Sequence, residues 1–116
     1  MDAGYTPHGK VAAAFAEALV ARDFAGAHQM LSAGARTEWT PAALEAAYTK
    51  MVEYFEGPAS FFQVTVVMSD WTGKIPGDVG WAYAAIAGDI ASEAVTVVVH
   101  DEDGRHVIRS IEWGRP

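Results

Sequence analysis

Hydrophobic residues in the first half of the chain recur every three or four positions, which is the spacing of one face of an α-helix. Val11, Phe15 and Leu19 recur in this way with alanines beside them, and a threonine and a proline precede the segment. Threonine can cap a helix, and proline suits its first turn because the amide that it lacks would have no partner there. The pattern therefore predicts an alanine-rich helix over residues 7–22.

Two further helices are predicted before residue 58. Asp23 can cap a second, shorter helix that ends at Gly34, and Thr40-Pro41 repeats the start signal of the first helix. The third helix ends before Gly57-Pro58. One of its faces carries large hydrophobic residues at spacings of four, three and four, namely Leu44, Tyr48, Met51 and Phe55. We expect the last three to point into the interior of the domain.

The hydrophobic period changes after residue 58, where four segments have the composition of β-strands. They cover residues 60–68, 81–87, 94–100 and 106–113. By period, residues 81–87 could also form a helix, but their short length and the flanking Gly80 and Gly88 favour a strand. A turn-rich loop separates the first two, and Asp103-Gly104 favours a two-residue hairpin turn between the last two. Helices that precede a run of antiparallel strands indicate an α+β fold, here three N-terminal helices packed on an antiparallel sheet of about four strands. With 116 residues we expect a single domain over residues 1–116.

Composition narrows the possible partners. Hydrophobic residues make up 51% of the chain, and 15 acidic against 8 basic residues give a net charge of −7. Such a surface disfavours nucleic acid and anionic membranes, and no run of residues has the length and apolarity of a membrane span. The absence of cysteine excludes thiolate metal sites and cysteine nucleophiles. We expect a soluble cytoplasmic protein, because the apolar stretch 11–21 contains Glu17 and follows a segment without the basic start of a secretory signal.

The order of the first elements carries a family resemblance. An alanine-rich helix leads into Asp23-Phe24-Ala25-Gly26-Ala27, Met30-Leu31-Ser32 follows, and then come a helix with a Thr-Pro start and the strand-rich half. Over roughly residues 8–113 this order resembles the nuclear-transport-factor-two-like superfamily, also called cystatin-like. The resemblance implies a cone in which helices pack into the concave face of a curved antiparallel sheet. Members include ketosteroid isomerases, scytalone dehydratase, limonene epoxide hydrolase, polyketide cyclases and many small bacterial proteins.

The catalytic members of that superfamily place a tyrosine or aspartate of the first helix, and carboxylates or histidine of the sheet, inside the cone. In this chain the inward stripe of the first helix is entirely apolar. We therefore expect a domain that binds a small, mainly apolar ligand or acts as a dimeric interaction module, with no catalytic residue, cofactor or metal. The alternative is an isomerase-, dehydratase- or cyclase-type enzyme, with Asp70 as general base and Tyr83 or His100 stabilising an enolate-like charge.

Six large side chains are the candidates for lining a ligand pocket, because aromatic rings with polar tips and methionine suit small apolar molecules. They are Trp39, Tyr48, Met51, Phe55, Trp81 and Tyr83. The alternative is that they fill the core or an interface, since a small domain buries most of its aromatic residues. In either case we expect Met51→Ala or Phe55→Ala to cost about 2–5 kcal/mol of stability.

Three charged residues in the second half have competing explanations. Asp70 and Asp78 flank the turn-rich loop, and each could be a general base or a turn-forming residue. Arg109 lies in an otherwise apolar strand and needs a partner there. That partner could be an anionic ligand, or an acid such as Asp89 or Glu93.

Two histidines flank the predicted hairpin turn, with three acidic residues between them. Imidazoles and carboxylates together suit zinc. A two-residue turn, however, pairs His100 with Val107 and points His100 and His106 to opposite faces, because successive strand residues alternate. We therefore favour a solvated hairpin tip over a metal site, while a three-residue turn would bring the two imidazoles together.

The last two strands are apolar on both faces, which is unusual for a sheet with one side in water. The alternation predicts one face with Val95, Val97, Val99 and Ile108. It predicts an opposite face with Thr96, Val98, Val107, Arg109, Ile111 and Trp113. Three helices can cover only one face, so we expect a homodimer formed through the sheet, with the choice of face left open.

Overall fold

The computed structural model describes residues 3–114 of the chain. In this part, a 3₁₀ turn η1 (Ala3–Tyr5) precedes four α-helices: α1 (Pro7–Val20), α2 (Phe24–Gln29), α3 (Ala33–Glu38) and α4 (Pro41–Val52). One antiparallel sheet follows, in the order β1 (Phe61–Met68), β2 (Asp78–Ala87), β3 (Ser92–Glu102) and β4 (Arg105–Trp113). The α+β fold expected from the sequence is confirmed.

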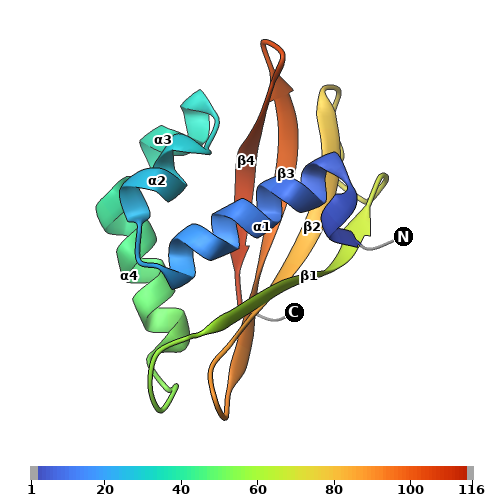
Figure 1. Cartoon of the computed structure of the whole chain (residues 1–116). Coiled ribbons are helices and arrows are strands. Elements are labelled where there is room, and N and C mark those ends of the chain that lie inside the picture. The colour runs from blue at the N-terminus through green and yellow to red at the C-terminus, as the bar shows by residue number, and fades with distance from the viewer. Residues whose placement is uncertain (1–2, 115–116) are drawn as a thin grey trace.

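The helices cover one face of a curved sheet. Helix α1 lies diagonally across that face, and α2, α3 and α4 stack beside it at the β4 side (Figure 1). Side chains between the two layers form the core, and the fully buried ones include Phe15, Leu19, Leu44, Ile86 and Ile108. The longest helix, α1, has 14 residues. None of the helices in residues 3–114 is long and apolar enough to cross a membrane.

Each α-helix begins at a side chain that caps it. The side-chain oxygen of the capping residue accepts a hydrogen bond from the amide three positions later, at 2.9–3.2 Å. The capping residues are Thr6, Asp23, Ser32 and Thr40. These bonds satisfy amides that have no partner inside the helix, which explains why the chain enters a helix at these points.

The segment predicted as the second helix is interrupted. Leu31 pairs with Ile108 in an isolated parallel bridge, and the amide of Ser32 donates to the carbonyl of Ile108 over 2.8 Å. Helix α2 ends before this bridge and Ser32 caps α3, so residues 3–114 contain four α-helices where the sequence predicted three. The bridge needs a partner from the last strand, and a local sequence pattern contains no sign of it.

The hairpin between β3 and β4 has the predicted two-residue turn. Glu102 pairs with Arg105 across Asp103-Gly104. Both turn residues have positive φ, 55° and 83°, as a tight hairpin of this kind requires. His100 and His106 therefore lie on opposite faces of the sheet, as expected.

A β-bulge in the same strand pair overturns one prediction. The register shifts next to Val98, so that Ile111 lies opposite Val97 and Trp113 opposite Val95. Ile111 and Trp113 consequently pack against the helix-side core, whereas the alternation predicted them on the other face. The extra residue of a bulge reverses the alternation beyond it.

The face that points away from the helices, which we call the outer face, is also largely apolar. The pairing of the strands places on it Phe61, Val66, Met68, Trp81, Tyr83, Ala85, Ala94, Thr96, Val98 and Val107. Phe61 and Val66 are exposed, while Ala94, Val98 and Val107 are buried without belonging to the helix-side core. The structure thus has the two apolar sheet faces expected from the sequence, with a corrected set of residues.

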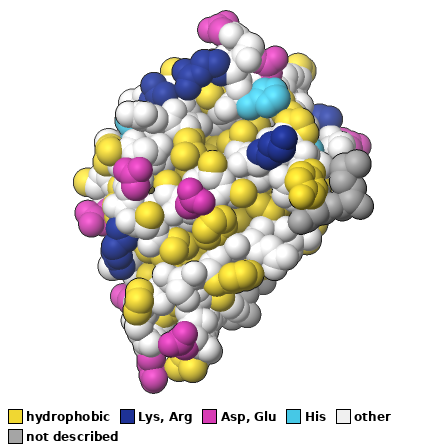
Figure 2. Space-filling view, in the orientation of Figure 1, with side chains coloured by type: hydrophobic (Ala, Val, Ile, Leu, Met, Phe, Trp, Pro, Cys, Tyr) yellow, Lys and Arg dark blue, Asp and Glu magenta, His cyan; other side chains and the backbone are white. Residues whose placement is uncertain are grey.

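The surface on the helix side is mixed in character. Figure 2, which has the orientation of Figure 1, shows acidic side chains spread over this side, with hydrophobic side chains visible between them. The acidic residues do not gather into one patch on the face in view.

Candidate functional site

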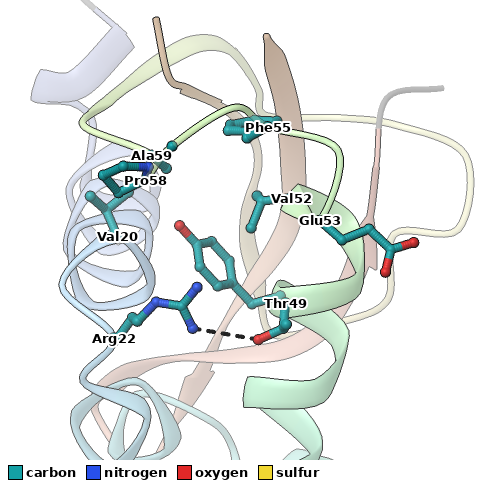
Figure 3. A pocket seen from close by; sticks show the side chains of 10 residues that line it. Val20, Arg22, Thr49, Val52, Glu53, Phe55, Pro58 and Ala59 are labelled. Carbon is teal, nitrogen blue, oxygen red and sulfur yellow. Dashed lines mark hydrogen bonds between the residues drawn. The ribbon is translucent and has the colours of Figure 1, made fainter.

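A cleft of about 370 Å³ opens between the end of α1, the end of α4 and the segment that leads into β1 (Figure 3). It is lined by Val20, Arg22, Tyr48, Thr49, Val52, Glu53, Phe55, Gly57, Pro58 and Ala59. Most of these residues are apolar by type, but polar groups, including those of Arg22, Thr49 and Glu53, supply somewhat more of the exposed lining than apolar atoms do. The volume lies in the range of small-molecule sites, roughly 300–1,000 Å³.

The backbone after α1 brings Arg22 to this cleft. Arg22 has a φ of 59°, a left-handed conformation of the kind that often follows the end of a helix. The Nη1 atom of Arg22 lies 3.5 Å from Oγ1 of Thr49, and its Cζ atom lies 5.5 Å from the centre of the Tyr48 ring. These contacts, a long hydrogen bond and a cation–π contact, join the end of α1 to α4.

Tyr48 is the buried aromatic residue of the cleft. Its residue surface is 2% exposed, and its ring lies 6.0 Å from that of Phe24, measured between ring centres. Burial raises the pKa of Tyr48, and the positive charge of Arg22 offsets part of that effect. The phenol is therefore neutral at physiological pH.

A second group of polar side chains lies on the outer face, where β2, β3 and β4 meet. Arg109 donates two hydrogen bonds to the carboxylate of Asp78, at 2.7 Å from Nε and 2.6 Å from Nη2. The same carboxylate lies 2.7 Å from Nδ1 of His100. The hydrogen bond from Arg109 is the main cause that holds the pKa of Asp78 well below its usual value of 3.8, against the opposing effect of burial.

This ion cluster fastens the loop of residues 69–77 to the sheet. Besides holding Arg109, Asp78 accepts a hydrogen bond from the amide of Ile75 at 3.0 Å, and Arg109 reaches the carbonyl of Gly73 at 3.4 Å. Because the guanidinium neutralises the carboxylate, Asp78 is a weak base and a weak ligand for a cation. Among residues 3–114, no group of three or more histidine, aspartate or glutamate side chains could hold a metal ion.

The structure corrects the partner suggested for Arg109. The sequence suggested Asp89 or Glu93, and the partner is Asp78. The turn role considered for Asp78 is present as well, in its hydrogen bond to the amide of Ile75. A pairing across three strands could not be read from the loop sequence, because the register of the strands decides it.

The residues predicted to bind a ligand on the helix side lie in two neighbouring places. Tyr48 and Phe55 line the cleft of Figure 3. Met51 lines a second, more open cleft of about 450 Å³ together with Trp113. Trp39 contacts the ring of Trp113, with 5.7 Å between ring centres. Both clefts contain a basic side chain, Arg22 in the first and Lys50 in the second, and the first is the more enclosed of the two and holds two of the predicted residues.

The other predicted residues lie elsewhere. Trp81 and Tyr83 are on the outer face, stacked with their ring centres 6.4 Å apart. His100 is on the same face, bonded to Asp78. Asp70 is exposed in the loop after β1. Among the described residues, Asp70, Tyr83 and His100 thus share no enclosed site with the helices.

Sequence reasoning missed Arg22, which stands between the first helix and the Asp23 cap. A basic residue between two helices in an acidic chain was the only available signal. That signal does not say where the side chain points, because the direction depends on the left-handed backbone at this position.

Comparison of the chain with protein-family models, with curated proteins and with solved structures finds no match. The function is therefore inferred from the geometry of the cleft and of the sheet.

Proposed function

We propose that this chain is a binding domain for a small, mainly apolar molecule, which occupies the cleft between α1, α4 and the segment before β1. The observation that carries the proposal is the cleft itself, with a volume of about 370 Å³ and a mixed lining in which apolar side chains lie beside exposed polar groups. Small-molecule sites in proteins commonly combine these features. Tyr48 and Phe55, two of the residues predicted from the sequence, belong to the lining.

The closed interior favours binding at the cleft over chemistry inside the cone. Phe15, Leu19 and Ile86 are fully buried between the helices and the sheet, so these apolar side chains fill the space a catalytic group would need. An isomerase-, dehydratase- or cyclase-type enzyme has less support, because Asp70 is exposed and Asp78 is neutralised by Arg109. A general base has to lie within hydrogen-bond reach of its substrate.

Binding can be tested with N-phenyl-1-naphthylamine, a neutral dye whose fluorescence rises in apolar sites. Ala59 lines the cleft, so Ala59→Trp fills it with a large ring and should abolish the fluorescence signal. Ala46→Trp, on the exposed side of α4, is the matched control and should retain the signal. Equal dye binding by the two variants would argue against this cleft as the site.

We also propose that the chain is a nuclear-transport-factor-two-like domain that works in the cytoplasm. The support for the family is the order of elements, in which helices come first and then cover one face of an antiparallel sheet (Figure 1). The cysteine-free composition and the net charge of −7 fit a reducing compartment and disfavour nucleic acid as partner. Cell fractionation tests the location.

Homodimerisation through the outer face is the second candidate function. Phe61 and Val66 are 53% and 46% exposed on a face that is otherwise largely apolar, and exposed apolar patches mark interaction sites. A second copy of the chain fits this face because Arg109 already neutralises Asp78. Two copies can therefore meet without burying an unpaired charge, in a self-complementary two-fold contact.

Light scattering over a range of micromolar concentrations tests the dimer. We expect the mass of two chains and an interface of at least about 1,000 Å², the usual size of a specific contact. A mass of one chain that does not change with concentration would contradict this second proposal and leave the ligand-binding proposal untouched.

A further inference from the structure

Arg22 is a cation without an acidic partner. Within residues 3–114, no carboxylate lies within 4.0 Å of its guanidinium. The ion pairs in this part of the chain join Asp78 to His100 and to Arg109. Its contacts are the hydroxyl of Thr49 and the face of the Tyr48 ring. The chain has 15 acidic residues for 8 basic ones. Acidic side chains are therefore common in this chain, yet none of those described forms an ion pair with Arg22.

Arg109 shows how the same chain satisfies a guanidinium. Two of its nitrogens lie 2.7 and 2.6 Å from the carboxylate of Asp78. Arg22 uses one nitrogen in a long hydrogen bond of 3.5 Å, and the rest of its planar fork is exposed to solvent at the cleft. A carboxylate from outside the chain matches such a fork, because it can accept two parallel hydrogen bonds and carries the opposite charge.

The remaining walls of the cleft restrict what the carboxylate is attached to. The apolar lining consists of Val20, Val52, Phe55, Pro58 and Ala59. Arg22 and Glu53 lie on opposite sides of the cleft (Figure 3). The Glu53 carboxylate points away from the cleft, so Arg22 supplies the charge that faces a ligand there. The chemistry therefore favours one negative charge joined to an apolar body.

We propose that the cleft binds a small hydrophobic monocarboxylate, with its carboxylate on Arg22 and Thr49 and its apolar body against the lining from α1, α4 and the segment before β1. The inference rests on the ligand-binding function proposed above and adds the charge of the ligand. Tyr48 is buried beside the guanidinium and is uncharged, so the positive charge of Arg22 remains available to the ligand.

Two matched probes test the charge preference. 4-Phenylbutyrate and 4-phenylbutyramide share one apolar body and differ in charge. Each is titrated into the isotope-labelled chain, and Kd is taken from shifts of the amide signals of the cleft residues. We expect the wild-type protein to bind the acid at least about tenfold more tightly than the amide, because only the acid forms charge-assisted hydrogen bonds with the guanidinium.

Arg22→Asn is the decisive variant. Asparagine tolerates the left-handed backbone at this position, so the turn is kept while the cation is removed. The acid should then bind no more tightly than the amide. Thr49→Val tests the same contact without touching the turn, and it should weaken the binding of the acid while leaving that of the amide unchanged.

Arg105→Asn, at an exposed arginine beside the hairpin turn, is the matched control and should keep the preference for the acid. Equal affinities of the wild-type protein for acid and amide, or a preference that survives Arg22→Asn, would overturn this inference and leave the proposed function standing. Failure of both probes to bind at millimolar concentration, together with failure of the neutral dye, would overturn both.

Discussion

At the scale of single residues, the carboxylate of Asp78 shows how burial and pairing go together. Its side chain is 0% exposed, and a buried charge is costly unless it is paired and hydrogen-bonded. Arg109, His100 and the amide of Ile75 supply the partners. The sequence indicated the turn role of Asp78 but not the ion cluster, because the two side-chain partners come from other strands.

Asp78→Asn should lower the free energy of unfolding by roughly 1.5–3 kcal/mol, the range for hydrogen bonds to charged groups. The amide keeps the shape of the side chain but leaves the guanidinium of Arg109 without an opposite charge. Urea unfolding at neutral pH measures the loss. Asp70→Asn is the control, because Asp70 is exposed in the same loop and should change stability by less than about 0.5 kcal/mol. Equal losses in the two variants would argue against the ion cluster.

The same cluster predicts a response to acid. Because Arg109 holds the pKa of Asp78 below its usual value of 3.8, the unfolded chain takes up a proton at higher pH than the folded one. The stabilisation is complete above pH 3.8 and is lost as the pH falls from there toward the lowered pKa. Unfolding measured between about pH 5 and pH 2 should therefore show a steeper loss for the wild-type protein than for Asp78→Asn. Parallel curves would contradict this assignment.

His8 predicts a second loss of stability at lower pH, which arises from a buried neutral histidine rather than from a paired carboxylate. His8 is 6% exposed, and neither of its ring nitrogens has a hydrogen-bond partner among the described residues. Burial, and then the charge of His106, lower the pKa of His8 from 6.5. Between 6.5 and the lowered value the unfolded chain binds a proton that the folded chain does not, so stability falls as the pH falls.

Urea unfolding at about pH 7.5 and about pH 5.5 measures this effect. The free energy of unfolding should change by at most about 1.4 kcal/mol per pH unit through this one group. His8→Leu should remove that part of the pH dependence. His28→Gln, at a half-buried histidine on α2, should leave it in place. A wild-type slope retained by His8→Leu would assign the effect to another group.

At the scale of elements, the hydrophobic period and the capping residues predicted α1 and α4, and composition predicted the four strands, with β2 assigned from its flanking glycines and short length because its period fits helix and strand alike. Both signals are local, and both act on the segment that carries them. The division between α2 and α3 and the bulge beside Val98 were missed, because each depends on a partner strand. The residues predicted to point inward from this helix also differ in how deeply they are buried. Tyr48 is buried and Met51 is half-buried in the last turn, whereas Phe55, which the sequence placed on this helix, lies beyond its end at Val52 and is half-buried.

This gradient along α4 is testable. Leu44 is fully buried in the core, so Leu44→Ala should cost roughly 2–5 kcal/mol through lost burial and a residual cavity. Met51→Ala should cost about 1 kcal/mol, closer to the average substitution and below the roughly 2–5 kcal/mol expected from the sequence, because the half-buried side chain borders an open cleft. Chemical denaturation of the two variants measures the difference. Similar losses would mean that Met51 belongs to the core.

At the scale of the whole molecule, one sheet separates two apolar layers. Val97 faces the helices and belongs to the core, while Val66 faces outward and is 46% exposed. The sequence predicted that both faces are apolar, and the register decided which residues lie on each. The candidate cleft was beyond sequence reasoning, because it forms where the end of α1, the end of α4 and the segment before β1 meet.

The exposed apolar layer leads to the last prediction. If a second copy covers the outer face, Val66→Glu should convert the dimer into a monomer, because it places an unpaired charge in a buried contact. The folded chain itself should be unaffected, since Val66 is exposed in a single chain. Ile90→Glu is the matched control: Ile90 is 70% exposed, but it lies in the turn between β2 and β3 rather than within a strand. Light scattering should give one-chain mass for Val66→Glu and two-chain mass for Ile90→Glu, and a two-chain mass for both would place the interface elsewhere.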